Sequence, residues 1–188
     1  MELLGIFSAF GLSASAGLNA YIPLLVVALL ARFTNLIKLN PPWDTLTSWW
    51  IIGLLVLLSL VEFFADKVPA VNHLNDIIQT VIRPAAGAIV FAASANVVDS
   101  ISPILALALG LVIAGAVHTV KAGVVRPAVT ATTAGLGNVP VSLAEDFVST
   151  LVSVLSVVVP VVVACFLIVI TAWIVWRIWR RARVAHQA

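Results

Sequence analysis

Long apolar runs separated by short polar stretches make up most of this chain. Residues 48–64 form an apolar run with Glu62 near its end, and further apolar segments cover residues 3–33, 84–98, 103–127 and 141–176. A helix that crosses a bilayer needs about 20 predominantly apolar residues. The pattern therefore predicts an all-α integral membrane protein, a bundle of about five to six transmembrane segments with two broken or re-entrant helices.

The first apolar segment, residues 3–33, is too long for one simple span and too polar in its middle. Its centre, residues 11–23, reads Gly-Leu-Ser-Ala-Ser-Ala-Gly-Leu-Asn-Ala-Tyr-Ile-Pro. Asn19 and Pro23 break or kink a helix, which a membrane tolerates only where protein or a water-filled cavity satisfies the backbone. We expect a discontinuous helix or a re-entrant pair here. Ordinary packing of small residues with a proline kink is the alternative.

A second irregular region lies in the C-terminal half. Residues 128–140 form an uncharged run of Thr, Ala, Gly and Asn, too apolar for an exposed loop and too irregular for a lipid-facing helix. We predict a buried re-entrant stretch there. The segment 141–176 predicts one long, Val-rich helix that contains Pro160. Ser142 and Glu145 have the spacing of a capping box, which places the start of that helix near Ser142.

Between these two regions, one segment alternates with a helical period. A helix is predicted over residues 71–82, and residues 84–98 complete a span with its last turns. Apolar side chains cover one face of the helix, so it either lies in the membrane interface or lines a polar cavity. The polar face consists of Asn72, Asp76, Gln79 and Arg83.

The two halves of the chain, residues 1–98 and 101–176, are weakly similar. In each half a broken, small-residue segment is followed by an acidic pair and by a helix with an internal proline. Membrane transporters often contain such repeats, with broken helices that meet at a midplane site. We therefore predict a single transmembrane domain over residues 1–188, with an inverted internal repeat and a basic tail at residues 177–188.

The composition leaves no room for a soluble domain. Hydrophobic residues make up 62% of the chain and charged residues only 10%, whereas soluble domains carry about 25% charged residues. The net charge of +2 does not suggest nucleic acid as a partner. The surplus positive charge follows a tryptophan-rich stretch near the C-terminus, which places the C-terminus on the cytoplasmic face. The orientation of the N-terminus stays open.

Ionisable and amide side chains lie between the apolar runs and supply the candidate site. An unpaired charge at the membrane centre costs about 2.5–3.5 kcal/mol on insertion scales, so these groups need partners or water. We predict that the acidic and basic sets meet in one polar core between the two halves. Helix ends at the headgroup level are the alternative. The candidate substrate- or ion-binding residues are Asn19, Glu62, Asp66, Lys67, Asp76, Arg83, His118, Lys121, Arg126, Asn138, Glu145 and Asp146.

Sequence motifs for catalysis are absent. The chain has no P-loop, no His-Glu-x-x-His, no Gly-x-Ser-x-Gly and no cysteine cluster. We therefore predict no enzymatic activity and no cofactor. Glu62, Asp66, His73 and Asp76 are a candidate oxygen- and nitrogen-rich set for a hard cation. Lys67 among them argues against a cation cage, so no metal site is predicted.

Three stretches of the chain resemble the bacterial membrane-protein family called domain of unknown function 4126. They read GLSASAGLNAYIP, EFFADKVPAVNHLNDIIQTVIRPAAG and HTVKAGVVRPAVTATTAGLGNVPVSLAED. The resemblance covers nearly the whole chain except the basic tail. It implies a multi-pass protein of the bacterial cytoplasmic membrane and supplies no activity. An acidic residue is expected near Asn72 in this family, where this chain carries the amide.

These features favour a small transporter that moves an ion or a small anionic or zwitterionic solute through a central charged site, with protons as a candidate coupling ion. Broken helices present backbone dipoles to such ligands, and arginine suits anion recognition. A flippase for a phosphate-bearing lipid would use the same basic side chains. A non-transporting scaffold subunit would keep the charges as a dry, paired core. Expected partners are the lipid bilayer, the solute or lipid phosphate headgroup, and a second copy of the chain in a homodimer.

Overall fold

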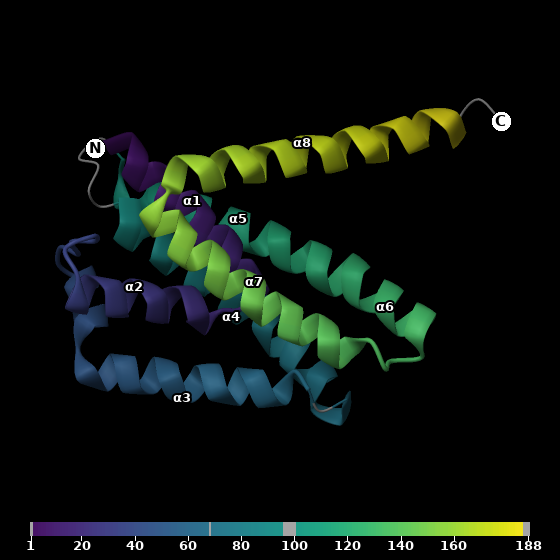
Figure 1. Cartoon of the computed structure of the whole chain (residues 1–188), viewed down its shortest axis with the longest axis horizontal. Helices are drawn as coiled ribbons and strands as arrows, with labels where there is room; N and C mark the ends of the chain where they lie inside the picture. The colour runs from purple at the N-terminus through teal and green to yellow at the C-terminus, as the bar shows by residue number, and fades with distance from the viewer. Residues whose placement is uncertain (1, 68, 96–100, 186–188) are drawn as a thin grey trace.

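The computed structural model describes residues 2–67, 69–95 and 101–185. Within these residues the chain is helical and forms no strand, as the apolar pattern predicts. Most helices run back and forth along the long axis of the molecule (Figure 1). The elements are α1 Glu2–Leu18, α2 Tyr21–Phe33, the 3₁₀-helix η1 Trp43–Thr47, α3 Trp49–Ala65, α4 Pro69–Ala95, α5 Pro103–Val120, the π-helix η2 Lys121–Val125, α6 Arg126–Thr133, α7 Asn138–Val158 and α8 Pro160–Ala185.

The first apolar segment is a discontinuous helix, as the sequence predicts. The α-helical pattern stops after Leu18 and resumes at Tyr21. The chain reverses direction at this break, so α2 returns toward the end of the molecule where α1 begins (Figure 1). Pro23 lies in the first turn of α2, where the missing N–H has no intrahelical partner to lose. The break is therefore at Asn19 and Ala20, not at the proline.

The middle of the chain forms two helices close to the predicted ones. The helix α3 begins where the apolar run begins, and the Ser48 hydroxyl accepts a hydrogen bond from the Ile51 amide at its N-terminus. The predicted helix over 71–82 and the apolar stretch 84–98 belong to one continuous helix, α4, which passes through Pro84. Residues 96–98 of that stretch lie outside the described residues.

The prediction of a buried re-entrant stretch at residues 128–140 is wrong. The helix α5 continues through η2 into α6, and a tight turn with Ala134 at φ 51° then leads into α7. Most side chains of 128–140 are exposed in the isolated chain. The Thr132 and Thr133 hydroxyls donate to the Ala128 and Val129 carbonyls one turn back, so this uncharged polar sequence satisfies its hydroxyls within its own helix.

The predicted long helix over 141–176 is two helices. The chain leaves α7 at Val159, and Pro160 begins α8, which runs back along the molecule (Figure 1). Pro160 has no N–H to donate and is therefore tolerated at a helix start. Ser142 does not cap a helix, because α7 already begins at Asn138 and the buried Ser142 hydroxyl donates to the Asp66 carboxylate at 3.4 Å.

The arrangement of the two halves does not support the predicted inverted repeat. The first half reverses direction at its break between α1 and α2, whereas the second half continues in one direction from α5 through η2 into α6 (Figure 1). A pair of inverted halves would place equivalent helices in equivalent relative directions. The shared small-residue and acidic elements therefore do not mark equivalent turns of the chain.

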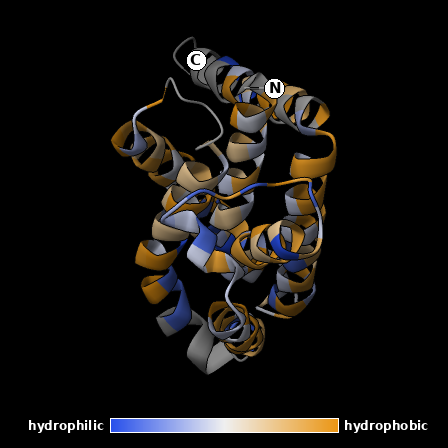
Figure 2. Cartoon of the chain, turned by 90° about the vertical axis from the view of Figure 1, so that its left-hand side faces the viewer, coloured by the Kyte–Doolittle hydropathy of each residue, from blue (hydrophilic) through white to orange (hydrophobic). Residues whose placement is uncertain are grey.

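Three helical stretches in the described residues are long and apolar enough to cross a membrane. They are Asn75–Ala95, Pro103–Thr133 and Asn138–Val158. The helices α1, α2 and α3 are also apolar but shorter. Hydrophobic helices surround a more hydrophilic centre (Figure 2). This is the polarity expected of a protein that faces lipid and holds its polar groups inside.

The core has an apolar part and a polar part. The helices α1, α4 and α5 pack together, and all three change from apolar to polar side chains at the same level. Ala9, Leu12, Val90, Phe91 and Ala106 belong to the apolar clusters formed by α1, α4 and α5 with their neighbours. Farther along α1 and α5, and before Pro84 in α4, the buried side chains become polar or charged. The apolar part holds the helices together, and the polar part forms the candidate site.

Glycines allow α4 and α5 to approach closely. A Cβ added at Gly87 or Gly110 would collide with the facing helix: at Gly87 with Ala114, and at Gly110 with the Gly87 carbonyl and, at 2.6 Å, with the Phe91 Cβ. Small residues at such an interface let helix backbones pack against each other in a membrane. This contact sets the distance between α4 and α5. The facing polar side chains of the two helices lie one to two turns away from it.

Candidate functional site

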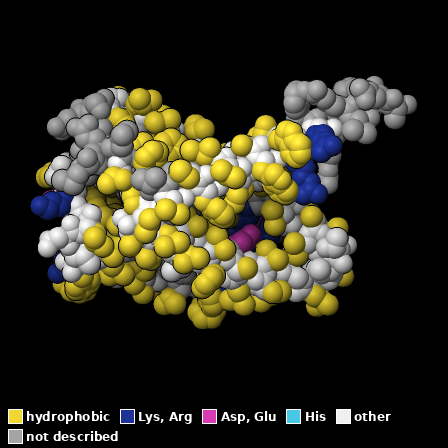
Figure 3. Space-filling model, turned by 45° about the horizontal axis from the view of Figure 1, so that its top comes forward, with side chains coloured by type: hydrophobic (Ala, Val, Ile, Leu, Met, Phe, Trp, Pro, Cys, Tyr) yellow, Lys and Arg dark blue, Asp and Glu magenta, His cyan; other side chains and the backbone are white. Residues whose placement is uncertain are grey.

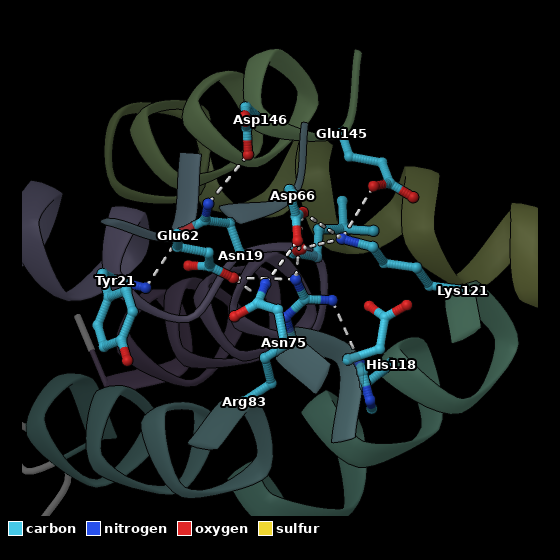
Figure 4. Close-up of polar contacts among 12 residues, drawn as sticks. Asn19, Tyr21, Glu62, Asp66, Asn75, Arg83, His118, Lys121, Glu145 and Asp146 are labelled. Carbon is cyan, nitrogen blue, oxygen red and sulfur yellow. Dashed lines mark hydrogen bonds and ion pairs between the residues drawn. The ribbon is translucent and has the colours of Figure 1, made fainter. Parts of the chain in front are cut away.

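Charged side chains from five elements meet beside the break between α1 and α2 (Figure 4). The end of α3, the polar part of α4, the α5–η2–α6 junction and the start of α7 surround the break. Six ionised side chains form one connected set of ion pairs, which we name the central charged network. Its members are Glu62, Asp66, Arg83, Lys121, Arg126 and Glu145.

Asp66 is the most highly connected carboxylate of the network. Its Oδ2 accepts from Arg126 Nη2 at 3.0 Å and from the Ser142 hydroxyl at 3.4 Å, and lies 3.9 Å from Lys121 Nζ. Its Oδ1 accepts from Asn75 Nδ2 at 2.6 Å. Both oxygens are therefore held, and three helices besides its own converge on this one side chain.

Glu145 and Lys121 connect the network to the helix break. Glu145 Oε2 lies 2.9 Å from Lys121 Nζ and 3.0 Å from Arg126 Nη2. Lys121 Nζ also donates to the Leu18 carbonyl at 2.8 Å. That carbonyl is at the C-terminal end of α1, where helical carbonyls lack intrahelical donors and the helix dipole is negative. The ammonium group thus stabilises the end of the broken helix.

Arg83 lies between an acidic and a neutral partner. Its Nε and Nη2 donate to Glu62 Oε1 at 3.3 and 2.9 Å, and its Nη1 donates to His118 Nδ1 at 3.2 Å. Because an arginine only donates, His118 Nδ1 must be the unprotonated ring nitrogen. The proton of the neutral ring is therefore on Nε2, which donates to the Thr80 hydroxyl at 3.1 Å.

Asn19 caps the second helix of the broken pair. Its Oδ1 accepts from the Tyr21 and Ile22 amides at 3.1 Å, which satisfies two N–H groups at the start of α2. Its Nδ2 donates to Asp146 Oδ1 at 3.0 Å. Asp146 in turn pairs with Lys67 at 3.2 Å. The break is thus tied by hydrogen bonds to the start of α7.

The central charged network is balanced and almost fully buried. It contains three carboxylates and three cations, with side chains 0–10% exposed. Withdrawing charges from water is costly, and only good geometry and additional hydrogen bonds offset the cost. The pairing satisfies this requirement. It also means that a ligand enters only by taking the place of an existing partner.

Some buried oxygen acceptors of the site have no hydrogen-bond partner. Within the described residues these include Glu62 Oε2, Asp76 Oδ1 and Gln79 Oε1. Unsatisfied polar atoms in a low-dielectric interior are costly, and they mark positions for water, protons or ligands. Figure 3 shows a hollow on one face of the molecule, with acidic and basic atoms visible inside it and hydrophobic side chains around it.

The comparison with known families agrees with the resemblance of the sequence. The family described as Domain of unknown function (DUF4126) matches residues 6–181. The chain belongs to the DUF4126 family. No curated protein and no solved structure shows significant similarity to this DUF4126 chain. The description of the family assigns no activity.

Most of the candidate residues predicted from the sequence come together in this DUF4126 protein. The exceptions are Asn138, which exchanges hydrogen bonds with Thr130 at the α6–α7 turn, and Asp76, which acts on Arg126 through its charge. The side chains of Asn72 and His73 lie outside the described residues. The residues that meet are Asn19, Glu62, Asp66, Lys67, Arg83, His118, Lys121, Arg126, Glu145 and Asp146.

Several polar residues of the site were not predicted. Asn75 binds Asp66, and Ser15 of α1 bonds the hydroxyls of Ser149 and Ser153 at 2.8 and 2.7 Å. The four buried serines of α7 recur at intervals of seven, four and three residues, which is the period of one helix face. That spacing was the available signal. These residues are Ser142, Ser149, Ser153 and Ser156.

The acidic groups are not arranged around a metal position. In the residues that the structure describes, no group of three or more His, Cys, Asp or Glu side chains could hold a metal ion. Cations of the protein itself lie between the carboxylates, with Lys121 and Arg126 on Glu145 and with Arg83 on Glu62. In this arrangement the protein's own cations neutralise the described carboxylates.

Proposed function

We propose that this DUF4126 protein is a small membrane transporter that moves an ion or a small anionic or zwitterionic solute through the central charged network, with protons as the coupling ion. The observation that carries the proposal is the position of the network at a helix break. Its ammonium group at Lys121 binds the Leu18 carbonyl at the end of α1, and Asn19 caps α2. Discontinuous helices with exposed ends are how many transporters hold charged substrates.

Two further features support transport. The π-helix η2 contributes Lys121 and directly precedes Arg126. Such π-helical turns inside longer helices are frequent at functional sites because they reposition side chains and loosen the hydrogen-bond ladder. Acidic and basic atoms are also visible inside a hollow on one face of the molecule (Figure 3). The charged network and a π-helical turn thus lie together.

We place the protein in the bacterial cytoplasmic membrane with its C-terminus in the cytoplasm. The stretches in α4, α5–α6 and α7 supply three spans by length and composition. The apolar α3 and the first part of α8 add two more crossings, with α1 and α2 as a hairpin that enters and leaves on one side. This gives five crossings, within the range expected from the apolar runs.

A scaffold function is the second candidate, and the pairing of the network favours it. Every cation of the network lies within 4 Å of a carboxylate, as expected for a dry structural core. A buried network that is fully satisfied can fix a unique packing without binding anything. The scaffold differs from the transporter in one measurable respect, because it moves no solute.

Solute flux in lipid vesicles tests the proposal. Purified protein is reconstituted, and uptake is measured for a panel of chloride, phosphate, small carboxylates and zwitterionic amino acids. The variants Arg83→Lys and Arg126→Lys keep the charge but lose bidentate recognition, so we expect the flux of the transported solute to fall about tenfold or more. Arg177→Lys, at an exposed position of α8, is the matched control.

Folding must be checked for each variant by helicity and by a monodisperse elution profile. Flux that is specific for one solute class, saturable and lost in the two site variants supports the transporter. If the folded wild-type protein moves none of the panel above empty vesicles, the transporter is excluded and the scaffold stands. Equal flux in the wild type and both site variants would place the pathway elsewhere in the protein.

A further inference from the structure

We infer that Glu62 is the proton acceptor of the site and an internal competitor for Arg83, so that one proton and one monovalent anion bind and move together. The inference rests on the proposed transport function and names its substrate class and coupling. It is drawn from three observations on the described side chains. These are the uneven sharing of cations among the carboxylates, a free buried oxygen of Glu62, and the charge balance of the central charged network.

The carboxylates of the network are not held equally. Asp66 lies within 4 Å of three cations and accepts from Asn75 and Ser142 as well. Glu145 pairs with two cations. Glu62 pairs with one, Arg83. Because a nearby cation stabilises the ionised form of a carboxylate, Glu62, with one cation within 4 Å, loses least when it is neutralised. A proton that reaches the network therefore goes to Glu62.

Glu62 also has a vacant position for the proton. Both hydrogen bonds from Arg83 end on Oε1, whereas Oε2 is buried and has no partner. In Figure 4 one carboxylate oxygen of Glu62 is directed to Arg83 and the other points away from it. A proton on Oε2 removes the negative charge from this buried carboxylate without displacing any existing contact. Asp66 offers no equivalent site, since both of its oxygens already accept hydrogen bonds.

The groups around Glu62 determine the effect of its protonation. Arg83 faces it from α4, Tyr21 from α2 and Lys121 from η2, while Asp66 comes one turn later at the end of α3. His118 does not compete for the proton while Arg83 donates to its Nδ1. With Glu62 neutral, Arg83 keeps its donors but faces no full negative charge from its main partner.

The charge balance of the network then defines the ligand. In the structure three carboxylates oppose three cations. Protonation of Glu62 leaves the network with one excess positive charge, and the fully buried Arg83 then keeps only the more distant Asp66 carboxylate, at 3.8 Å. An uncompensated buried charge is strongly unfavourable, and a single monovalent anion with two acceptor atoms restores the balance when it replaces the neutral Glu62 side chain as the acceptor of the Arg83 hydrogen bonds. The empty state and the state with one proton and one anion are both neutral.

Coupled uptake of protons and anions tests this inference. Vesicles containing the full chain and a pH-sensitive dye receive methanesulfonate, which is the anion of a strong acid and does not cross lipid as a neutral molecule. With acid outside, we expect anion uptake with one proton per anion. Uptake should fall about tenfold for each unit by which the outside pH is raised, because a proton is a co-substrate. Asp44→Asn, an exposed residue of η1, should behave as the wild type.

The variant Glu62→Gln separates coupling from transport. The amide copies the protonated side chain, so we expect anion exchange to continue without proton movement and without dependence on pH. Wild-type anion uptake that carries no protons, or proton coupling that survives in Glu62→Gln, overturns the inference and leaves transport intact.

A second measurement needs no flux. Methanesulfonate is added to the detergent-solubilised wild type in weakly buffered solution. The protein should then take up about one proton per chain, and a soluble pH dye measures this uptake. Proton uptake without any vesicle flux refutes the proposed transport but supports the Glu62–Arg83 exchange. Flux without proton uptake in either assay refutes the exchange alone, and this result stands even if Glu62→Gln fails to fold.

Discussion

At the scale of single residues, the carboxylate of Asp66 has the largest share in holding the polar core together. It is 2% exposed as a side chain, and Arg126, Lys121 and Arg83 all lie within 4 Å of its Oδ2. Asp66→Asn keeps the size but leaves an excess buried cation. We expect a loss of about 3–5 kcal/mol in unfolding free energy, because breaking a buried pair leaves a charge uncompensated. Denaturation in mixed micelles measures it.

Asp44→Asn is the control for this change, since the exposed Asp44 side chain of η1 makes no side-chain ion pair in the described residues. Surface substitutions usually change stability by less than about 0.5 kcal/mol. If Asp66→Asn were as stable as the control, the charges around Asp66 would have to be solvated, and the network would not be the dry core that the distances indicate.

The contact between Asn19 and Asp146 supports a swap experiment. Asn19→Asp retains an N-cap oxygen for α2 but replaces the donor that faces Asp146 Oδ1 at 3.0 Å with a second carboxylate. We expect it to destabilise the protein at neutral pH. The double variant Asn19→Asp with Asp146→Asn restores a donor facing an acceptor and should recover part of the loss, with a coupling of about 0.5–3 kcal/mol. Additive effects in the thermal unfolding of the four proteins would contradict the contact.

The sequence predicted that charged side chains would meet, but it did not predict which acidic residue would pair with which basic residue. Glu62 and Asp66 are one helical turn apart, and like charges at that spacing indicate a basic partner nearby. Arg83 lies 2.9 and 3.8 Å from them. Whether Lys121 and Arg126 reach Glu145 depends on how far α5, η2 and α6 extend past the break. A π-helical turn sets that distance, and the periodicity of the sequence does not predict such a turn.

At the scale of the helices, the contact between α4 and α5 positions Arg83 against His118. Gly110→Ala would place a methyl group 2.8 Å from the Ala88 Cα and against the Gly87 carbonyl, where backbone cannot yield. We expect a loss of about 1–3 kcal/mol from overpacking, together with reduced flux. Gly53→Ala, on an exposed face of α3 with nothing within 4 Å of the new Cβ, should be neutral or stabilise by up to about 1 kcal/mol.

Thermal unfolding of the two alanine variants side by side checks this prediction. The two substitutions add the same group to a helical glycine, so they differ only in what that group meets. A Gly110→Ala protein as stable as Gly53→Ala would show that α4 and α5 are not in backbone contact at this level.

The breaks between helices were predictable only where side chains compete for the backbone. The side-chain oxygen of Asn19 accepts a hydrogen bond from the Tyr21 amide at the start of α2, and such local hydrogen bonding is typical of a helix break. Pro160 gives no such signal, because prolines inside membrane helices often only kink them. Whether the chain bends or reverses at Val159 is decided by the packing of α7 and α8 against α1, which involves residues more than a hundred positions away.

At the scale of the whole molecule, the polar part of the core lies toward one end. The network occupies the side where α3 ends and α7 begins, while the apolar clusters of α1, α4 and α5 fill the other side (Figure 1). The charged side chains therefore lie nearer the end of the molecule that carries the α6–α7 turn (Figure 1).

The placement of the termini yields an orientation that the sequence left open. The N-terminus lies at the end of the molecule that carries the α2–α3 connection, and the C-terminus lies at the opposite end with the α6–α7 turn (Figure 1). Arg177 and Arg180 near the C-terminal end, with Lys67 at the end of α3, outweigh Arg32 and Lys38 at the other end. Positive charge in short connections favours the cytoplasm, so the N-terminus should be outside.

Cysteine labelling tests this orientation in right-side-out vesicles. In a Cys165→Ala background, Leu36→Cys and Leu136→Cys place single thiols at positions 60% and 84% exposed, in the α2–α3 connection and the α6–α7 turn. A membrane-impermeant maleimide should label position 36 in intact vesicles and position 136 only after permeabilisation. Labelling of both from one side contradicts the five-crossing arrangement, because an odd number of spans separates the two positions. Labelling with the sides exchanged keeps that arrangement but places the charged hollow on the outer face.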